Sequence, residues 1–379
     1  MSDRIAKVVL ILMATGTVFV ISAGTSLSYQ LDWARLYTHP GLRQLAFLPL
    51  AILTMFAVSR FDHRHLSFAR GPWRSLTLYL LVLSTALLAV ALMIGTERGG
   101  AQRWIFLTVG PLNVSFQPSE LAKWAAIFFC AAICAHWDFQ FQSYWRQFVP
   151  ICLVLGLVVA LIVLEDFGTA ALVALLTFTM LMVGGAKWWH LLSPLPIAIT
   201  GFVWALFQAP HRLRRLAAFL HPEEWSDTVA YQANQSLIAL GSGGIWGKGL
   251  GGGICKYGHL PADTTDFVFA IIGEELGFIG CAGVILLFIV FVFLGMQVVA
   301  RCKEDFSRLL ATGIILALAI QAALNIGVVT VVLPTKGIPL PFISRGGTSL
   351  LLSAAAVGIL LNIARQVDRD ATQESLPQE

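Results

Sequence analysis

Charged side chains are scarce in this sequence. Aspartate, glutamate, lysine and arginine together make up 12% of the 379 residues, whereas a soluble globular domain has about 25%. Hydrophobic residues make up 57%, and the mean hydropathy is +0.78. These values exclude a water-soluble fold. Because each hydrocarbon-spanning helix needs roughly 20 apolar residues, most of the chain is expected to form one membrane domain.

Other features are also missing, and each absence argues against a class of protein. The six cysteines form no CxxC pair, and only Cys255 falls in a predicted outer segment, so neither a disulfide framework nor a zinc site is expected. The net charge of +4 is small and the basic residues are scattered, so we expect no nucleic-acid binding. No internal repeat or matched pair of broken helices is visible, which disfavours an inverted-repeat transporter.

What the sequence does contain is a series of long apolar runs. They are bounded by charged or Gly/Pro-rich breaks, and they predict an all-α integral membrane protein with about ten transmembrane helices. The sixth and seventh runs are the hardest to separate, because only residues 184–187 lie between them. The runs cover 5–27, 42–59, 75–95, 119–136, 148–164, 168–185, 187–208, 266–300, 307–332 and 342–364.

The run order predicts the domain organisation and the topology. Residues 1–365 form the membrane domain, 366–379 form a polar, disordered cytoplasmic tail, and 209–265 form a long extracytoplasmic loop between helices seven and eight. Lysine and arginine number 13 on the side of the termini and 12 on the other, with five of those 12 in the long loop. Because long loops count little in the positive-inside rule, both termini are predicted to be cytoplasmic.

The long loop is expected to carry structure of its own. Its apolar and aromatic residues are sufficient to pack or to lie in the membrane interface. Residues 210–220 predict a short amphipathic helix, whose Arg212, Arg214 and Arg215 would lie near lipid phosphates.

A glycine-rich stretch follows, with nine glycines among residues 241–258. It is not a Walker loop, because Lys248 is followed by Gly249 instead of serine or threonine. Two interpretations remain. The backbone could approach a bulky ligand closely, with Lys248 and Lys256 available to anions, or the stretch could be a simple hinge.

Acidic residues stand at the mouth of the next predicted helix. Asp266 follows Thr264 and Thr265, so its carboxylate either caps the helix or is functional. At about 100° per residue, Glu274 lies about 80° from Asp266 around the helix and Glu275 about 180°. Only Glu274 could therefore share the side of Asp266. Both glutamates have the alternative of pairing with neighbouring helices.

Basic residues stand at matching depth in other outer segments. Arg103 ends one outer loop, Lys123 lies one turn inside the next helix, and Lys336 and Arg345 belong to the last outer segment. Lys123 has the alternative of pairing with Glu120, three residues earlier. A carboxylate base beside converging cations suits a lipid-diphosphate substrate, because its anionic leaving group needs charge stabilisation and no general acid.

Five sequence blocks occur in an order typical of one membrane family. They are GAQRWI with FQPSELAK, EDFGTA, YQANQSLIALGSGGIWGKGLG, LPADTTDFVFAIIGEELGFIG, and NIGVV with LPTKGIPLPFISRGGTSL. The blocks resemble those of the SEDS family (shape, elongation, division and sporulation). The resemblance implies a ten-helix glycosyltransferase of the bacterial inner membrane. Such an enzyme joins lipid II disaccharides into peptidoglycan, releases undecaprenyl diphosphate and works with a class B penicillin-binding transpeptidase.

The resemblance also assigns residues to roles. Asp266, in the TDF motif, is the expected catalytic residue. No metal site is expected within the protein, although a divalent cation such as Mg²⁺ could accompany the diphosphate. Arg103 and Lys123 occupy basic positions of the family and Lys336 falls in its LPTKG motif, so these three are expected to bind the substrate. Beyond the resemblance, the further candidates for substrate binding are Gln235, Lys248, Ser344 and Arg345, and the candidates for supporting roles are Glu120, Asp166, Glu274 and Glu275.

Two motifs depart from the family pattern. PADTTDF replaces the common PEAHTDF, and SRGGTS replaces the common SYGGSS. The departures add Asp263 and Arg345, which could pair with each other.

The sequence leaves alternatives open for two questions, which are the branch of the family and the mode of action. LPTKG favours the cell-division (FtsW-like) branch, whereas GKGLG and GIPLP also occur in rod-shape (RodA-like) proteins. Other divisome or elongasome proteins and membrane lipids are further expected partners. One alternative is a lipid II flippase, which needs access from both sides and no catalytic base. The other is an inactive scaffold that recruits the transpeptidase.

Overall fold

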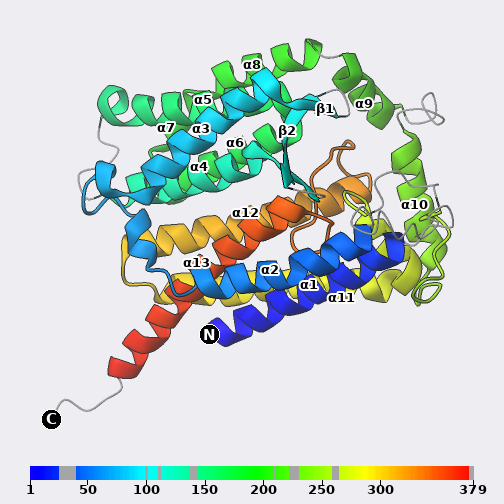
Figure 1. Cartoon of the computed structure of the whole chain (residues 1–379). Coiled ribbons are helices and arrows are strands. Elements are labelled where there is room, and N and C mark those ends of the chain that lie inside the picture. The colour runs from blue at the N-terminus through cyan, green and yellow to red at the C-terminus, as the bar shows by residue number, and fades with distance from the viewer. Residues whose placement is uncertain are drawn as a thin grey trace.

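A computed structural model of the protein describes most of the chain as a bundle of helices that lie alongside one another (Figure 1). The small β-sheet, α9 and α10 lie at one end of the bundle, and both chain ends lie toward the other. The described residues are 1–24, 40–98, 101–109, 112–136, 143–208, 210–221, 230–257 and 264–374.

Each of the ten predicted apolar runs contains a helix. Within the described ranges, eight helical stretches are long and apolar enough to cross a membrane, which confirms the all-α membrane class. The exact number of ten spans remains a prediction, because α4 and α6 are shorter. The helices are α1 (Ser2–Gly24), α2 (Pro40–Val58), α3 (Leu76–Ile94), α4 (Pro118–Cys134), α5 (Val149–Glu165), α6 (Phe167–Val183), α7 (Trp188–Leu192) with α8 (Leu195–Phe207), α11 (Val268–Arg301), α12 (Asp305–Val329) and α13 (Gly347–Glu374).

The segments between these helices add shorter elements. In the long loop, α9 (Pro210–Leu220) matches the predicted amphipathic helix, and α10 (Tyr231–Gly243) packs on α11. Between α3 and α4 the chain forms an antiparallel sheet of β1 (Thr96–Arg98), β2 (Ala101–Val109) and β3 (Leu112–Phe116). The sequence analysis did not predict this sheet. Its signal is the run of aromatic and β-branched residues on either side of a Gly-Pro pair.

The expected disordered tail does not begin at residue 366. The last helix, α13, continues to Glu374, so the prediction of disorder is wrong for residues 366–374. The amino group of Met1 forms an ion pair with Asp368 at 2.8 Å, which ties the start of the chain to this extension. Residues 375–379 lie outside the described part.

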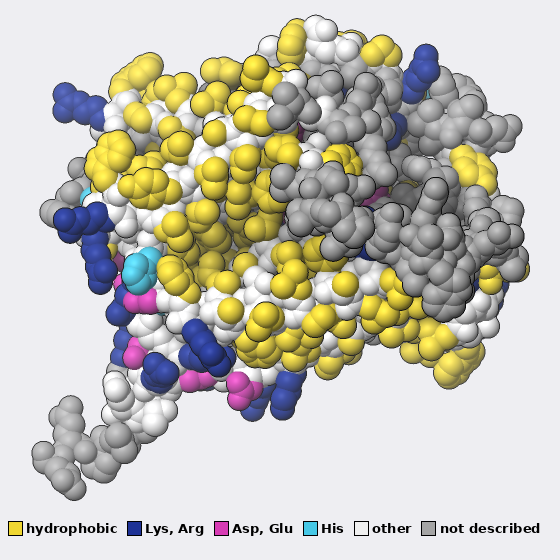
Figure 2. All heavy atoms as spheres, in the orientation of Figure 1, with side chains coloured by type: hydrophobic (Ala, Val, Ile, Leu, Met, Phe, Trp, Pro, Cys, Tyr) yellow, Lys and Arg dark blue, Asp and Glu magenta, His cyan; other side chains and the backbone are white. Residues whose placement is uncertain are grey.

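The most buried helices lie at the centre of the bundle. Burial differs between the most apolar 18-residue windows of the spanning helices. In α12, 67% of the window is buried, and in α13 61%, but in the α7–α8 stretch only 11% is buried. Hydrophobic side chains cover the middle of the visible surface, and charged side chains gather mainly toward the end that carries the chain termini (Figure 2). The outer helices therefore present an apolar surface to lipid, while α4, α12 and α13 form the interior.

A glycine lets α1 touch the loop between α12 and α13. A β-carbon on Gly16 would lie 2.4 Å from the Cα of Ile343 and 2.6 Å from the carbonyl oxygen of Phe342. Phe342 has a φ of 66°, a left-handed conformation that is costly for an aromatic residue. The absence of a side chain at Gly16 therefore permits a backbone contact that holds this loop in place.

We expect Gly16→Ala to lower the stability of the purified protein by roughly 1–3 kcal/mol, because the added methyl group collides with backbone atoms. Gly156 of α5 is the matched control, because a β-carbon there would meet nothing within 4 Å. Thermal unfolding in detergent should show a lower midpoint for Gly16→Ala only. Equal midpoints for the two variants would contradict the close contact.

A buried histidine joins three segments at the end of the bundle near the termini. His63 is fully buried, and its Nδ1 and Nε2 atoms each lie 2.7 Å from a partner, Asn362 Oδ1 and Ser307 Oγ. Burial lowers the pKa of His63 below 6.5, while the hydrogen bond to Asn362 and the nearby charges of Asp62 and Glu304 oppose that shift. The neutral imidazole is therefore the form that the fold stabilises.

This arrangement predicts a pH-dependent stability. A histidine with a lowered pKa binds fewer protons when folded than when unfolded, so its contribution is present above pH 6.5 and is lost as the pH falls below it. The slope should be at most about 1.4 kcal/mol per pH unit for one proton. The free energy of unfolding, measured between neutral and acidic pH, should fall less steeply in His63→Gln than in the parent protein. His65→Gln, which changes the exposed neighbour, should keep the slope of the parent protein.

Candidate functional site

A cavity of about 330 Å³ opens where α5, α6, α8, α9, α10, the turn before α11 and the loop between α12 and α13 meet. It combines acidic and basic side chains with aromatic walls, and it contains three of the residues selected from the sequence, Asp166, Asp266 and Lys336. The described residues that line it are Glu165, Asp166, Phe167, Gly168, Phe202, Leu206, Arg212, Arg215, Leu216, Gln232, Asp266, Phe267, Pro334, Thr335, Lys336 and Gly337.

Asp266 reaches the cavity from the turn that precedes α11. Phe267 occupies the N-cap position of this helix, so Asp266 lies one residue outside the position at which a side chain usually caps. Its carboxylate lies against Gly337, where a β-carbon would be 2.9 Å from Oδ2. Asp266 is half-buried. The geometry therefore places a carboxylate at the wall of a cavity, next to a glycine that leaves room for it.

Lys336 approaches the same cavity from the loop between α12 and α13. Its ammonium nitrogen lies 4.0 Å from the ring centre of Phe167 and 6.0 Å from that of Phe202. Burial lowers the pKa of Lys336 to about 8, and the negative charge of Asp166 opposes that shift. Lys336 is therefore a cation at neutral pH that loses its proton under mildly alkaline conditions.

Asp166 supports this part of the cavity from the start of α6. It is the N-cap residue, and its Oδ1 accepts hydrogen bonds from the backbone N–H groups of Gly168 at 2.9 Å and Thr169 at 3.2 Å. Gly168 also leaves space for the stem of Lys336, because a β-carbon there would lie 3.4 Å from its Cδ. Asp166 thus stabilises the helix end that carries Phe167.

Arg212 of α9 turns toward the protein. Its guanidinium group donates hydrogen bonds to the carbonyl oxygens of Ala205 at 3.0 Å and Val163 at 3.2 Å, and it lies 5.4 Å from the ring centre of Phe167. These contacts attach α9 to the ends of α5 and α8. Carbonyl groups at two helix ends thus bind the guanidinium group of Arg212, and its expected position near lipid phosphates stays a prediction.

Two amide side chains that the sequence analysis missed hold the Lys336 loop. Gln321 donates a hydrogen bond to the carbonyl oxygen of Pro339 at 2.8 Å, and Asn325 donates to Ile338 at 2.7 Å. Asn325 also donates to the backbone carbonyl of Asp266 at 2.8 Å. The available signal was the presence of two amides four residues apart on an otherwise apolar helix, which places both on one face.

Lys123 does not line the cavity. It is fully buried, forms an ion pair with Glu120 at 2.9 Å and donates a hydrogen bond to Gln321 Oε1 at 2.8 Å. Glu120 in turn accepts a hydrogen bond from Ser349 at 2.9 Å. The alternative that Lys123 and Glu120 pair is therefore confirmed. Through Gln321, the pair is connected to the loop that carries Lys336.

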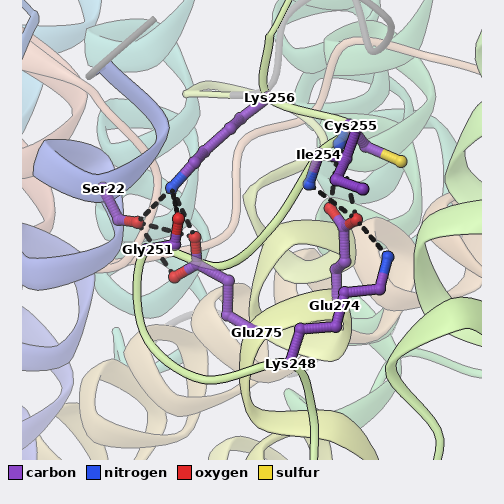
Figure 3. A network of polar contacts seen from close by, with 8 residues as sticks. All are labelled: Ser22, Lys248, Gly251, Ile254, Cys255, Lys256, Glu274 and Glu275. Carbon is purple, nitrogen blue, oxygen red and sulfur yellow. Dashed lines mark hydrogen bonds and ion pairs between the residues drawn. The ribbon is translucent and has the colours of Figure 1, made fainter.

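Glu274 and Glu275 lie away from the cavity. Glu274 pairs with Lys248 at 2.8 Å, and Glu275 pairs with Lys256 at 2.9 Å (Figure 3). Lys256 is buried, so the interpretation that it is available to an anion is wrong. Glu274 was expected to share the side of Asp266, but it is not among the described residues that line the cavity. The glycine-rich segment covers it instead.

The other selected residues occupy the surroundings of the site. Ser344 is buried, and its hydroxyl accepts a hydrogen bond from the N–H of Leu340, while the N–H of Arg345 donates to the carbonyl of Thr264. Gln235 is half-buried on α10, one turn from Gln232, the glutamine that lines the cavity. The side chain of Arg103 and all of Asp263, with its expected pairing to Arg345, lie outside the described part.

Among the described residues, the cations that line the cavity are Arg212, Arg215 and Lys336, so Lys336 is the one member of the expected cation group found there. No three histidine, cysteine, aspartate or glutamate side chains of these residues are placed to hold a metal ion. The lining combines three acidic side chains, Glu165, Asp166 and Asp266, with these cations, which suits proton abstraction beside a developing negative charge.

Sequence comparisons identify the relatives of this chain. A family model described as a cell cycle protein (FtsW/RodA/SpoVE) matches residues 3–369. The chain is 36% identical to stage V sporulation protein E of Bacillus subtilis, over 94% of this chain and 95% of that protein. It is 38% identical to a probable peptidoglycan glycosyltransferase FtsW of Geobacter sp. (strain M18), over 72% of this chain and 74% of that protein.

Solved structures resemble the whole fold. A chain of a peptidoglycan synthase complex that coordinates polymerization and crosslinking aligns with a TM-score of 0.74 and 26% identity, over 96% of this chain and 97% of its own. The rod shape determining protein RodA of Thermus thermophilus aligns with a TM-score of 0.66 and 27% identity, over 96% of both chains. From its cavity, its helix bundle and its match along almost the entire sequence, this chain belongs to the FtsW/RodA/SpoVE family, the SEDS family of multi-pass membrane proteins.

Proposed function

We propose that this protein is an inverting peptidoglycan glycosyltransferase that polymerises lipid II with Asp266 as the general base. The observation that carries the proposal is the position of Asp266 and Lys336 on the wall of the same cavity. The names of the relatives, several of which are probable peptidoglycan glycosyltransferases, support the reaction class. The family also makes it a bacterial inner-membrane protein.

The reaction requires one displacement. The 4-hydroxyl oxygen of the acceptor sugar attacks the anomeric carbon of the donor, and its proton passes to the carboxylate of Asp266. The bond between the anomeric carbon and the diphosphate oxygen breaks, and the electron pair leaves with undecaprenyl diphosphate. Attack opposite the leaving group inverts the α-linkage of the donor to the β-linkage of the product.

The leaving diphosphate needs compensating charge. Lys336 and Arg215 are the cations of the described lining best placed to supply it, because Arg212 already donates to two backbone carbonyls. Arg103 retains the role that its motif implies. For Lys123 we propose an indirect role, since its pairing with Glu120 and Gln321 supports the loop that carries Lys336. The described side chains offer no cluster that fits a resident divalent cation.

The proposal also includes an orientation of the protein in the membrane and a partner protein. We propose that both termini lie in the cytoplasm and the cavity on the outer side, because lysine and arginine number 13 on the side of the termini against 7 on the other side once the long loop is left out. A class B penicillin-binding transpeptidase is the proposed partner. Its support is the likeness to a chain from a complex that coordinates polymerization and crosslinking.

We expect Asp266→Asn to lower glycan polymerisation by about 10²–10⁴-fold, because the amide cannot accept the proton. The assay uses the purified protein with its transpeptidase partner and labelled lipid II, with the polymer resolved by electrophoresis. Asp305→Asn is the matched control, because Asp305 lies at the opposite end of the bundle and pairs with Arg308. Its polymer yield should equal that of the parent protein.

Three outcomes separate the alternatives. Normal polymer from Asp266→Asn would remove this residue as the base. Translocation of lipid II across liposomes without any polymer from the parent protein would favour the flippase. Neither polymer nor translocation, with the transpeptidase still bound, would favour the scaffold.

The lowered pKa of Lys336 predicts an alkaline limit to the reaction. Lys336 must be protonated to stabilise the diphosphate, so kcat/KM should fall as the pH rises through about 8. Lys336→Arg should retain activity further into the alkaline range, because arginine keeps its charge there. Lys187→Arg, at the far end of α6, is the control and should keep the alkaline limb. An unchanged pH profile in Lys336→Arg would contradict the role of this cation.

A further inference from the structure

The charged groups of the glycine-rich segment 244–257 pair with two buried carboxylates (Figure 3), with Lys256 buried and Lys248 keeping 30% of its side chain exposed. Glu274 accepts hydrogen bonds from Lys248 at 2.8 Å and from the backbone N–H of Ile254 at 2.9 Å. Glu275 accepts from Lys256 at 2.9 Å and from Ser22 at 2.7 Å. Both carboxylates are 0% exposed. Two positive and two negative groups are thus paired beneath the segment.

The large apolar side chains of the same segment point outward. Trp246 is 80% exposed, Leu250 63%, Ile245 62% and Ile254 57%. A loop in water shows the opposite distribution, with charged groups outside and large apolar groups inside. The segment is therefore suited to apolar surroundings.

Part of the backbone of the segment also bonds directly to α11. Its N–H groups at Lys248 and Gly249 donate to the carbonyls of Glu274 and Glu275, at 3.0 and 2.9 Å. Its Gly244 carbonyl accepts from the N–H of Phe278 at 2.9 Å. Non-helical backbone near hydrocarbon is tolerated only when protein groups satisfy it in this way.

Glycines permit this contact between the segment and α11. Gly277 breaks the helix with a φ of 67° and a ψ of −160°, and its backbone meets that of Gly247, which has a φ of 79°. A β-carbon on Gly247 would lie 2.2 Å from the carbonyl oxygen of Glu275. The glycines therefore allow the segment to lie directly on the kinked helix, and neither the ligand-approach nor the hinge interpretation is needed to explain these two positions.

The exposed apolar surface continues onto α11. The N–H of Phe278 and the N–H of Ile279 both bond to the segment, and their side chains are 69% and 48% exposed. Further along the helix, Leu286 is 59% exposed and Phe293 is 61% exposed. Because α11 is a membrane-spanning helix, its exposed apolar side chains face lipid. The segment extends that lipid-facing surface beyond the kink.

We propose that residues 244–257 form an interfacial membrane loop, whose Ile245, Trp246, Leu250 and Ile254 side chains insert among the acyl chains of the adjacent leaflet. The occupant is lipid because the apolar surface is continuous with that of a spanning helix and the loop's charges are compensated internally. Tryptophan at this position fits the preference of its ring for the membrane interface. The loop would thereby anchor α10, which packs on α11 and supplies Gln232 to the cavity.

The test compares Trp246 fluorescence in nanodiscs of different lipid composition. The parent protein and Trp246→Phe are reconstituted, without any partner, in phosphatidylcholine with bromines near the carbonyl end of the chains, bromines near the methyl end, or none. The difference between parent and variant emission isolates Trp246. We expect at least about twofold stronger quenching by the bromines near the carbonyl end, as for a ring at the interface. Trp124→Phe is the control, because Trp124 is only 3% exposed. The difference between the emission of the parent protein and that of this variant should not respond to bromine.

Other results would overturn the proposal. Equal Trp246 emission in all three lipids, together with strong quenching by iodide in the buffer, would place the loop in water. Bromine quenching that disappears when the transpeptidase partner is added would assign the surface to that protein instead. An unchanged unfolding midpoint of Trp246→Phe ensures that the comparison reports the environment of the ring rather than a loss of folding.

Discussion

The side-chain amide of Asn325 donates to two backbone carbonyls, those of Asp266 and Ile338, at 2.8 and 2.7 Å. One carbonyl belongs to the turn that precedes α11, and the other belongs to the loop that carries Lys336. Asn325 is 1% exposed, so both hydrogen bonds are made away from water, where an unpaired amide or carbonyl group is costly. This single side chain therefore ties the backbone of the proposed base to the loop that carries the proposed cation, and both residues line the cavity.

Charge compensation divides the end of the bundle that carries the cavity into two kinds of site. Lys123 and Glu120 pair with each other inside the bundle, and Lys256 pairs with Glu275 beneath the glycine-rich segment. Such pairs allow ionised groups to exist near hydrocarbon, because an isolated charge there is very costly. In the cavity, by contrast, Lys336 packs on an aromatic ring and has a lowered pKa, as expected of a group that acts on a ligand.

Backbone contacts through glycine explain several motifs that side-chain chemistry does not. Gly16 lets α1 touch the loop at Phe342 and Ile343, and Gly247 lets the glycine-rich segment touch α11. A Walker-like interpretation of that segment fails in the structure for the same reason as in the sequence. The backbone amides of Lys248 and Gly249 donate to carbonyls of α11, and those of Ile254 and Cys255 donate to the Glu274 carboxylate, so these amides already have partners within the protein.

The sequence alone determined the membrane class, the positions of the ten apolar runs, the helix at 210–220 and the family, because hydropathy, helical periodicity and motifs are properties of short segments. It also selected Asp266, Asp166 and Lys336, which share the cavity. Only the tertiary structure decided which charged groups face a cavity and which pair with each other. From the sequence, Lys123, Lys256 and Arg212 could each meet an anionic group, but their roles depend on partners up to about 200 residues away in the chain, such as Gln321 for Lys123. Hydropathy cannot identify such partners, because a buried pair and a ligand-facing charge have the same residue types and the same local sequence signal.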